Sequence, residues 1–315
     1  MLRALAAVLA AAGLHHASLL LDWTPNPDHV GFYYAQDKGF FARNGLDVSI
    51  DAPSDPAAPL KLVAAGRTDF AVSYEQEVLI AAAKKLPVVA VAAVVPRPLN
   101  SFIAIDPKIR TLADLKGRTI GITGVPSDYA ALDSALASAG LRRSDVNVVS
   151  VGYSLLPALL AHKVDAVLGV YRNVEGIELT ERGLHPTIIP LDRAGVPTYD
   201  ELVLVASATR LHDPAYAGEA RSFVRAFLAG TAAAERDRAG AISVLKEATA
   251  ESARFLDRAT PATLALLSGP GGVGCVRTSD WQRFADWMHT HNLLKTPLRA
   301  SDAMTTRFLP RRCRA

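Results

Sequence analysis

Polar and aromatic residues gather directly after the first apolar segment of the chain. Asp22, Trp23 and Asn26 follow the apolar run 19–21, and His29 comes three residues after Asn26. A carboxylate accepts hydrogen bonds, an amide donates and accepts them, and an indole ring stacks on a heteroaromatic ring. Stacking of a base on an aromatic side chain is worth about 1–3 kcal/mol. At the carboxyl end of a strand, these residue types predict a ligand-binding site.

Two of these residues also have explanations that need no ligand. Asn26 lies between Pro25 and Pro27, where an asparagine side chain often stabilises a turn. His29 suits a ligand contact or a structural hydrogen bond, and no companion His or Cys has the spacing of a metal site. Trp23 precedes Thr-Pro-Asn-Pro, which cannot continue a β-ladder, so we expect its ring at a cleft edge rather than in a core.

Two later strand ends carry the same combination of residue types. The residues are Tyr74 and Glu75 after the segment 70–73, and Tyr171, Asn173 and Glu175 after the segment 166–170. An acidic first turn also stabilises a helix, which is the alternative explanation for Glu75 and Glu175. Because parallel strands end at one edge of a sheet, we expect these side chains to face a common cleft.

A neighbouring glutamate provides a comparison for Glu175. Glu178 has a basic residue, Arg182, four positions further on, whereas Glu175 has none. An ion pair with Arg182 along the helix therefore competes with a ligand contact for Glu178, whereas Glu175 has no such competing partner.

The acidic residues Asp22, Glu75 and Glu175 favour a ligand that donates hydrogen bonds. The exocyclic amine and a protonated ring nitrogen of an aminopyrimidine donate two hydrogen bonds to one carboxylate, which is a charge-assisted bidentate pair. A sulfonate or nitrate would instead require hydroxyls, backbone amides and arginine. We therefore expect an aminopyrimidine rather than an anion.

A sheet must position these residues, and the chain alternates short β-rich segments with helical ones. This alternation predicts a largely parallel α/β sheet. After residue 207 the β-rich segments stop and helices follow. The expected strands are 19–23, 46–51, 70–73, 88–95, 101–105, 119–123, 146–151, 166–170, 187–190 and 202–206. The expected helices include 32–44, 214–235, 239–250, 253–267 and 278–292.

Two segments rich in proline and glycine, 96–98 and 195–198, divide this pattern. Such residues mark turns and hinges, and the α/β block between them predicts a second lobe inserted into the first. Ordinary surface turns within one domain are the alternative. We expect lobe I to comprise residues 18–97 and 199–315, and lobe II to comprise residues 98–198.

Two glycine-rich segments lack the features of a nucleotide site. The segment 121–128 follows an expected strand but lacks the Lys-Ser/Thr pair of a Walker motif. A helix start capped by Ser127 or Asp128 explains it. The segment 271–274 lies among expected helices, and we expect a flexible loop there.

Composition and the amino-terminal residues restrict the class of protein. The chain has 315 residues, 50% of them hydrophobic, and its 34 basic and 31 acidic side chains nearly balance, so we expect no nucleic-acid partner.

The amino terminus has the order of a secretory signal: Arg3, then an apolar run to residue 14, then the small residues Ala17 and Ser18. We expect residues 1–17 to be a signal peptide; an alanine-rich first helix is the alternative.

Four blocks in a fixed order make the chain similar to the thiamine-pyrimidine-precursor binding proteins of bacterial ABC transporters, a family shared with the yeast pyrimidine synthase. The blocks are 22–31 with 38–41, 69–75, 169–176 and 195–200, within a similarity over roughly residues 19–210. The resemblance implies an α/β, two-lobed type II periplasmic-binding-protein fold with a hinge cleft. Where the family commonly carries tryptophan, this chain has Arg172, which leaves Tyr171 or Tyr199 as the aromatic partner of Trp23.

The resemblance implies an exported, periplasmic or extracytoplasmic solute-binding protein. Its ligand would be a thiamine precursor such as N-formyl-4-amino-5-aminomethyl-2-methylpyrimidine, and its protein partner an ABC permease in the membrane. We expect a monomer. Riboflavin, another flat heterocycle, or a sulfonate- or nitrate-type solute are the alternative ligands. The expected ligand-binding residues are Asp22, Trp23, Asn26, Tyr74, Glu75, Tyr171, Asn173, Glu175 and Tyr199.

The synthase branch of the resemblance makes an enzyme the competing class. Those enzymes carry a cysteine-rich iron motif, a lysine that forms a Schiff base with pyridoxal phosphate, and a sacrificial histidine. This chain has only Cys275 and Cys313, and it has Ser73 and Glu77 where the lysine and histidine would fall. We therefore expect no catalytic residue, metal or cofactor. Whether the two cysteines pair is left open by the sequence.

Overall fold

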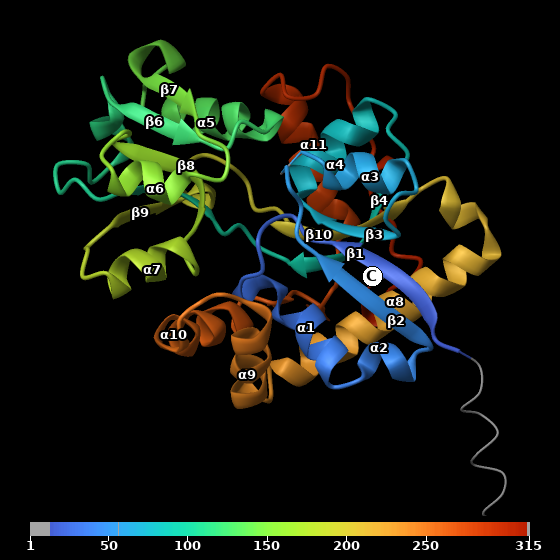
Figure 1. The fold of residues 1–315 in the computed structure, drawn as a ribbon. Coiled ribbons are helices and arrows are strands. Elements are labelled where there is room, and N and C mark those ends of the chain that lie inside the picture. Colours follow the sequence, from blue (N-terminus) through green and yellow to red (C-terminus); the bar gives the residue numbers. More distant parts are fainter. Residues whose placement is uncertain (1–12, 56, 314–315) are drawn as a thin grey trace, which may run out of the picture.

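Two separate sheets organise the chain into two lobes (Figure 1). The computed structural model describes residues 13–55 and 57–313. Most of the expected signal peptide, residues 1–17, lies outside the described residues, and its last three residues, from His15 on, belong to the first strand.

The sheet of lobe I has the strand order β2-β1-β3-β10-β4. β1 pairs in parallel with β2 and β3, whereas β10 runs antiparallel to β3 and β4. Its strands are β1 (His15–Leu20), β2 (Leu46–Asp51), β3 (Phe70–Ser73), β4 (Val88–Val95) and β10 (Leu202–Ser207). The expectation of a largely parallel sheet is therefore corrected to a mixed sheet, because β10 enters from lobe II and runs opposite to its neighbours.

The sheet of lobe II has the order β7-β6-β8-β5-β9. β6 pairs in parallel with β7 and β8, and β5 runs antiparallel to β8 and β9. Its strands are β5 (Asn100–Ala104), β6 (Thr119–Ile122), β7 (Asn147–Ser150), β8 (Ala166–Tyr171) and β9 (Thr187–Pro190). This sheet repeats the plan of the first, with one returning strand beside its parallel strands.

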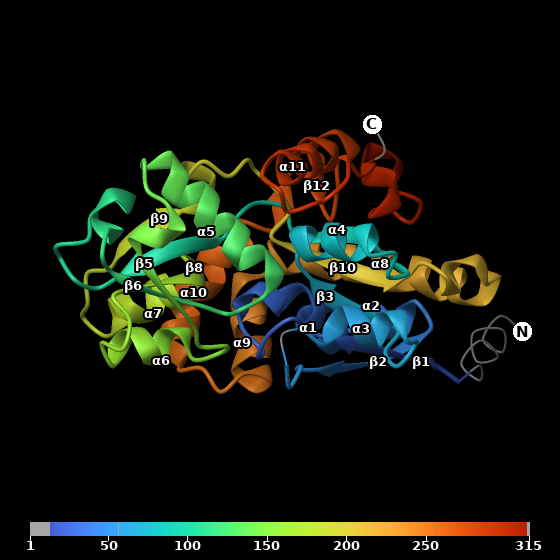
Figure 2. The ribbon, with the colours of Figure 1, turned by 90° about the horizontal axis from the view of Figure 1, so that it is seen from above.

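The chain passes between the sheets twice. It leaves lobe I between β4 and β5 and returns between β9 and β10. The segments 96–98 and 195–198 lie in these two crossings. Figure 2 shows the lobes side by side, with β5, β6, β8 and β9 on one side and β1, β2, β3 and β10 on the other.

Helices cover both sheets. Those of lobe II are α5 (Pro126–Ser138), α6 (Leu155–Leu160) and α7 (Glu175–Glu181). Those packed with lobe I are α1 (Val30–Asp37), α2 (Phe40–Arg43), α3 (Pro59–Ala64), α4 (Glu75–Ala83), α8 (Pro214–Ala234) and α11 (Thr278–Thr290). Strands β4 and β10 are buried along their whole length, as expected of strands covered on both faces. No helix in the described part of the chain is long and apolar enough to cross a membrane.

A pair of helices, α9 (Arg238–Ala248) and α10 (Ala253–Leu264), connects the two lobes. α9 packs on α1, and α10 contacts both the short helix η1 (Pro27–His29) of lobe I and α7 of lobe II. Arg254 and Arg258 of α10 form ion pairs with Glu181 of α7. These helices lie below the gap between the lobes in Figure 1.

Two predicted elements differ from the structure in instructive ways. The expected helix 32–44 is divided into α1 and α2, because Gly39 has a φ of 69° in the left-handed region. The expected strand 19–23 begins earlier, at His15, and ends at Leu20, which leaves Asp22 and Trp23 beyond the strand. The four expected helices after residue 207 correspond to α8, α9, α10 and α11 with nearly the same bounds.

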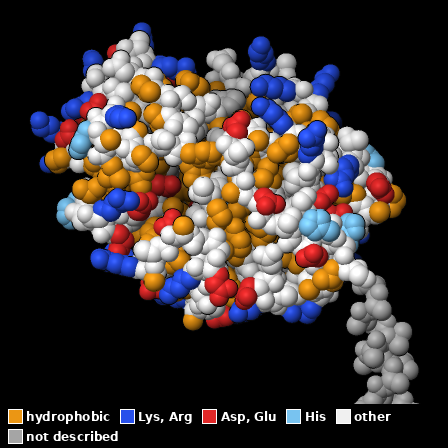
Figure 3. Space-filling model, viewed as in Figure 1, with side chains coloured by type: hydrophobic (Ala, Val, Ile, Leu, Met, Phe, Trp, Pro, Cys, Tyr) orange, Lys and Arg blue, Asp and Glu red, His pale blue; other side chains and the backbone are white. Residues whose placement is uncertain are grey.

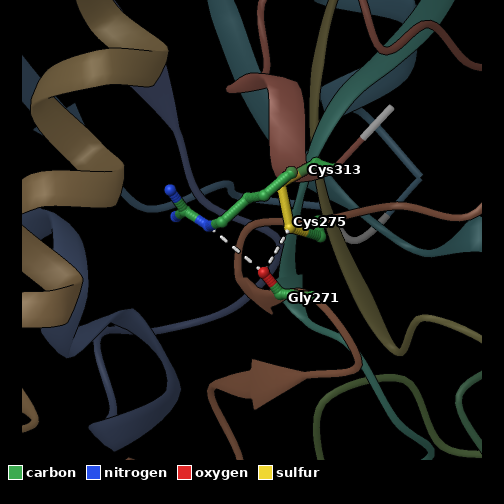
Figure 4. The surroundings of a disulfide bond; sticks show 4 residues. Gly271, Cys275 and Cys313 are labelled. Carbon is green, nitrogen blue, oxygen red and sulfur yellow. Dashed lines mark hydrogen bonds between the residues drawn. A yellow bond between two sulfur atoms is a disulfide. The ribbon is translucent and has the colours of Figure 1, made fainter. Parts of the chain in front are cut away.

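The segment expected to be a flexible loop is part of a hairpin beside a disulfide. β11 (Ser268–Gly269) pairs with β12 (Gly272–Val273), and Cys275 is bonded to Cys313 (Figure 4). The Nε of Arg312 donates to the carbonyl oxygen of Gly271 at 3.2 Å. The two cysteines therefore pair, and the disulfide attaches the carboxyl-terminal turn to lobe I.

Candidate ligand-binding cleft

The gap between the lobes contains a cleft that is partly open to solvent. Figure 3 shows a groove between the lobes with hydrophobic and acidic side chains along it. Both lobes contribute to its lining. Of the nine predicted site residues, those that line the cleft are Asp22, Trp23, Asn26, Tyr74, Tyr171 and Glu175.

Asp22 is held in a fixed position at the base of the cleft. It is 2% exposed, and its Oδ2 accepts a hydrogen bond from the hydroxyl of Tyr74 at 3.1 Å. Its Oδ1 lies 2.9 Å from Nε2 of the buried His29. The backbone N–H of Asn26 donates to Nδ1 of His29 at 3.2 Å, so Nε2 carries the proton and donates it to Asp22. His29 thus positions Asp22 and does not line the cleft.

Asn26 combines a structural role with a place in the cleft lining. Its side-chain oxygen accepts a hydrogen bond from the backbone N–H of Asp28 at 2.8 Å, which caps the short helix η1. Its amide nitrogen donates to the carbonyl oxygen of Thr24 at 3.1 Å. The turn explanation therefore holds for Asn26, and both polar ends of its side chain are engaged by its own loop.

Trp23 meets an aromatic side chain from the opposite lobe. Its ring lies 4.0 Å from the ring of Tyr153, centroid to centroid, and the two planes make an angle of 76°. Tyr153 belongs to the loop between β7 and α6 of lobe II. Trp23 thus contacts Tyr153, which the sequence did not indicate; of the two tyrosines expected opposite Trp23, Tyr171 lines the cleft and Tyr199 does not.

Four carboxylates line the cleft, two from each lobe: Asp22, Asp128, Glu175 and Glu201. None of the lining residues in the described part of the chain is Lys, Arg or His. Glu201 Oε2 accepts hydrogen bonds from the backbone N–H groups of Leu99 and Asn100 at 2.7 and 2.8 Å. Its other oxygen, Oε1, is buried with no partner among the described residues. The cleft is therefore acidic and has free acceptor capacity.

Burial shifts the proton affinity of these carboxylates. Desolvation raises the pKa of Glu201 and of Glu175 to about 7. The hydrogen bonds that each carboxylate accepts from backbone N–H groups lower its pKa, but they do not offset the effect of burial. Desolvation also raises the pKa of Asp128 to about 6, although Thr123 Oγ1 and the N–H of Gly124 donate to it. A hydrogen-bond donor or a cation in the cleft would favour the ionised forms of these groups.

Glu75 lies outside the cleft, contrary to the prediction. Its Oε2 accepts a hydrogen bond from the backbone N–H of Asp200 at 2.6 Å, and its burial raises its pKa well above the usual range. Asp200 in turn accepts a hydrogen bond from Nε1 of Trp281 at 2.8 Å. Glu75 begins α4 with its side chain bound to the backbone of Asp200, and the next residue, Gln76, lines the cleft.

Asn173 joins the lobes instead of lining the cleft. Its amide nitrogen donates to Oδ1 of Asp28 at 2.7 Å and to Oγ1 of Thr263 at 2.8 Å. Asp28 belongs to lobe I and Thr263 to α10, and all three side chains are buried. Desolvation raises the pKa of Asp28 well above its usual range, although the hydrogen bond from Asn173 acts in the opposite direction.

Tyr199 also lies outside this cleft. Its ring stacks on Phe284 of α11 with centroids 4.8 Å apart and planes 26° from parallel, which separates it from Trp23. Its hydroxyl donates to Glu201 at 3.1 Å. Tyr199 lines a second cavity, which adjoins the first.

Sequence reasoning missed several residues that line the cleft. They are Gln76, Asn100, Thr123, Val125, Ser127, Asp128, Gly169, Val174 and Glu201. Glu201 had a usable signal, since it is an acidic residue directly before the apolar run 202–206 and just after the predicted crossing 195–198. Gly169 has a φ of 104°, and a Cβ there would lie 2.9 Å from Cγ2 of Thr123, so a side chain would strain the backbone and the cleft wall.

The fold is that of the two-lobed periplasmic binding proteins. The alkanesulfonate-binding protein SsuA from Xanthomonas axonopodis pv. citri, solved with bound MOPS, superposes with a TM-score of 0.73 at 19% identity, covering 94% of this chain and 99% of that one. The aliphatic sulphonate binding protein SsuA from Escherichia coli gives a TM-score of 0.70 at 15% identity, covering 91% of this chain and 96% of that one.

Sequence comparisons identify the family within this class. The family described as NMT1/THI5 like matches residues 26–240, and the chain belongs to this family. A formylaminopyrimidine-binding protein from Halalkalibacterium halodurans is 34% identical over 304 residues, which is 93% of this chain and 90% of that protein.

Two further relatives match over shorter stretches. A putative thiamine biosynthesis protein from Haemophilus influenzae is 42% identical over 197 residues, covering 62% of this chain and 63% of its own length. A 4-amino-5-hydroxymethyl-2-methylpyrimidine phosphate synthase from Saccharomyces cerevisiae is 28% identical over 166 residues, covering 52% of this chain and 48% of the synthase.

Proposed function

We propose that this protein is the solute-binding protein of an ABC importer and captures a thiamine-related aminopyrimidine. N-formyl-4-amino-5-aminomethyl-2-methylpyrimidine is the ligand we infer. The observation that carries the proposal is the cleft itself, which has two carboxylates from each lobe, the aromatic rings of Trp23, Tyr74 and Tyr171, and no basic side chain among its described lining residues. The family and the name of the Halalkalibacterium relative support the same ligand class.

The cleft chemistry favours a ring that donates hydrogen bonds. An aminopyrimidine presents an exocyclic amine and, when protonated, a ring N–H, and both are donors that a carboxylate accepts in a charge-assisted pair. Glu175 and Asp22 supply such acceptors from opposite lobes. The same lining disfavours a sulfonate, because four carboxylates would repel an anion and no described lining residue would neutralise it.

We infer that the lobes close around the ligand. Residues 18–97 and 199–315 would form one body and residues 98–198 the other, with the crossings at 96–98 and 195–198 as hinges. Glu175 and Asp128 approach the ligand from lobe II, whereas Asp22 and Glu201 approach it from lobe I. A ligand that binds both pairs stabilises the closed form, which an ABC permease would recognise.

We infer a binding protein rather than a synthase. Both cysteines of the chain are joined in the disulfide, so neither offers a thiolate for an iron motif. Ser73 and Glu77 stand where the synthase lysine and histidine would fall, and the carboxylate of Glu77 accepts a hydrogen bond from the N–H of Ser127 at 3.1 Å. Incubation with pyridoxal phosphate is expected to give no imine absorbance.

An exported, monomeric protein is the form we propose for this function. The disulfide between Cys275 and Cys313 supports an oxidising compartment, where such bonds form and persist. Because β1 begins at His15, we place the end of any removed signal segment before that residue rather than after residue 17.

Calorimetry with a panel of solutes tests the ligand. The panel contains N-formyl-4-amino-5-aminomethyl-2-methylpyrimidine, 4-amino-5-hydroxymethyl-2-methylpyrimidine, thiamine, riboflavin and taurine. We expect binding of at least one of the two pyrimidines and no heat with taurine, because taurine carries a sulfonate. Binding of taurine without either pyrimidine would refute the proposal, and riboflavin as the tightest ligand would replace the aminopyrimidine with a larger heterocycle.

The ring of Trp23 in the cleft lining gives a further prediction. Replacing Trp23 by leucine keeps apolar surface but removes a stacking face, so we expect the affinity for the pyrimidine to fall about tenfold. Tyr153→Leu should cause a smaller loss, because Tyr153 is absent from the cleft lining and acts only through its contact with the ring of Trp23. Tyr129→Leu is the matched control, since Tyr129 is an exposed aromatic residue of lobe II outside the cleft lining. Unchanged affinity in Trp23→Leu would remove its ring from the binding site.

A further inference from the structure

A second cavity, partly open to solvent, lies between the lobes beside the cleft. Helix α5 of lobe II and helix α11, which packs with lobe I, contribute to its walls, and the two helices lie next to each other in Figures 1 and 2. Its walls are mainly apolar and aromatic. Among them are Ala131, Leu191, Val196, Phe284, Trp287 and Met288. We call this cavity the apolar annex.

The annex is continuous with the acidic cleft. Gln76, Asn100, Ser127 and Asp128 line both cavities, so these four residues form the junction between them. Gln76 is only 9% exposed, and its Oε1 has no hydrogen-bond partner among the described residues. The polar groups are concentrated at the junction, and the walls beyond it carry no acidic or basic side chain among the described residues.

The aromatic walls of the annex are held in place without a ligand. Phe284 stacks on Trp287 with centroids 5.4 Å apart and on Tyr199 with centroids 4.8 Å apart. Trp281 anchors the same helix through its hydrogen bond to Asp200. A preformed apolar wall favours binding because little conformational entropy is lost when an occupant arrives.

Water is a poor occupant of such a space. An ordered water needs two to four polar partners, and beyond the junction the lining residues with a polar side-chain atom are Tyr199, whose hydroxyl already donates to Glu201, and Trp287. A second, independent ligand is also disfavoured, because the one carboxylate of the annex, Asp128, belongs to the cleft as well. The occupant that fits is an uncharged, apolar group that enters through the junction from the cleft.

We propose that the annex binds an apolar arm of the molecule whose aminopyrimidine head occupies the cleft. This inference rests on the proposed function and extends its ligand class: besides the N-formyl compound, the protein binds aminopyrimidines whose uncharged substituent is larger than a formyl group. Such a ligand contacts α5 and α11 at once, and its apolar arm adds to the contacts that hold the lobes together.

Three N-acyl derivatives of 4-amino-5-aminomethyl-2-methylpyrimidine test the annex by calorimetry. The formyl, butanoyl and benzoyl derivatives share the head and differ only in the arm. We expect the benzoyl derivative to bind at least about tenfold more tightly than the formyl derivative, because its ring leaves water for apolar walls.

Variants that fill the annex should remove this gain. Ala131→Phe fills the annex from lobe II, and Leu293→Trp fills it from the opposite wall. Each variant should bind the formyl derivative with an affinity within about twofold of the original protein. Each should also bind the benzoyl derivative no more tightly than the formyl derivative, because the space for the larger arm is filled. Ala137→Phe adds the same ring to an exposed position of α5 and is the matched control. Unchanged formyl binding shows that a filled variant is folded, and two variants from opposite walls keep the test valid if one does not fold.

The possible failures are distinct. Equal affinities for the three derivatives, or a benzoyl advantage that survives both fillings, would overturn the annex proposal and leave the proposed function intact. No binding of any derivative would overturn the proposed function and the annex proposal with it.

Discussion

Glu175→Gln is expected to weaken binding of the aminopyrimidine by about 10- to 150-fold, the factor that corresponds to about 1.5–3 kcal/mol for a hydrogen bond to a charged group. Glu175 lines the cleft, and its Oε2 accepts the backbone N–H of Tyr171 at 2.7 Å. Glutamine retains one oxygen for that N–H but loses the charge and the second acceptor. Calorimetry with N-formyl-4-amino-5-aminomethyl-2-methylpyrimidine measures the change.

The same helix supplies the control for this experiment. Glu178 also lies in the first turn of α7, but its carboxylate forms an ion pair with Arg182 at 2.6 Å and is absent from the cleft lining. Glu178→Gln should leave the affinity within about twofold, because a surface ion pair contributes little. If both substitutions have equal effects, Glu175 does not contact the ligand.

The unliganded protein should lose stability as the pH rises from about 5 to about 8. Glu201 is 1% exposed, and burial raises its pKa from 4.5 to about 7. Between these two values the folded protein keeps a proton that the unfolded chain releases, so the free energy of unfolding falls with increasing pH. The loss from Glu201 alone is about 2–3 kcal/mol over this range. Glu175, with a pKa of about 7, and Asp128, with a pKa of about 6, change stability in the same direction.

Urea denaturation at the two pH values, followed by tryptophan fluorescence, checks this expectation. Glu201→Gln cannot ionise but still offers an acceptor to the N–H groups of Leu99 and Asn100. Between the two pH values, the free energy of unfolding of Glu201→Gln should therefore fall by about 2–3 kcal/mol less than that of the original protein. Glu178→Gln should show the same loss as the original protein. A pH dependence that is identical in Glu201→Gln and the original protein would contradict the role assigned to Glu201.

Prediction of the elements from sequence succeeded where local signals agree with packing. The four helices after residue 207 appear in the structure as α8 to α11, because each has apolar residues that become buried on one side of the helix. The helix expected over 32–44 is broken at Gly39, where a glycine adopts a left-handed conformation inside a helical pattern. The hairpin at 268–273 was missed because it depends on contacts with distant parts of the chain, including the disulfide.

Strand direction was beyond sequence reasoning for a similar reason. An apolar segment such as 202–207 indicates a strand but not its orientation. β10 is antiparallel to β3 and β4 because the chain returns from lobe II at that point. The two crossings were visible as proline- and glycine-rich segments, whereas the order of the strands was not.

The cleft shows the same division between local and distant information. Residues directly after a strand, such as Asp22, Trp23 and Tyr74, line it as expected, because a strand end places its next residues at the sheet edge. Glu75 and Asn173 also follow strands, yet they turn toward partners more than 80 residues away in the chain. Tyr153 meets Trp23 from a loop whose sequence carries no corresponding signal.

The amino-acid sequence by itself determined the α/β character of the chain, its two crossings, and the acidic and aromatic chemistry at three strand ends, because these features depend on neighbouring residues. Only the tertiary structure decided which side chains face one another across the lobes, and it added Glu201 and Asp128 to the cleft. It also paired Cys275 with Cys313 and opened the annex behind Gln76. These features depend on the packing of two lobes, in which contacts between distant residues determine the direction of each side chain.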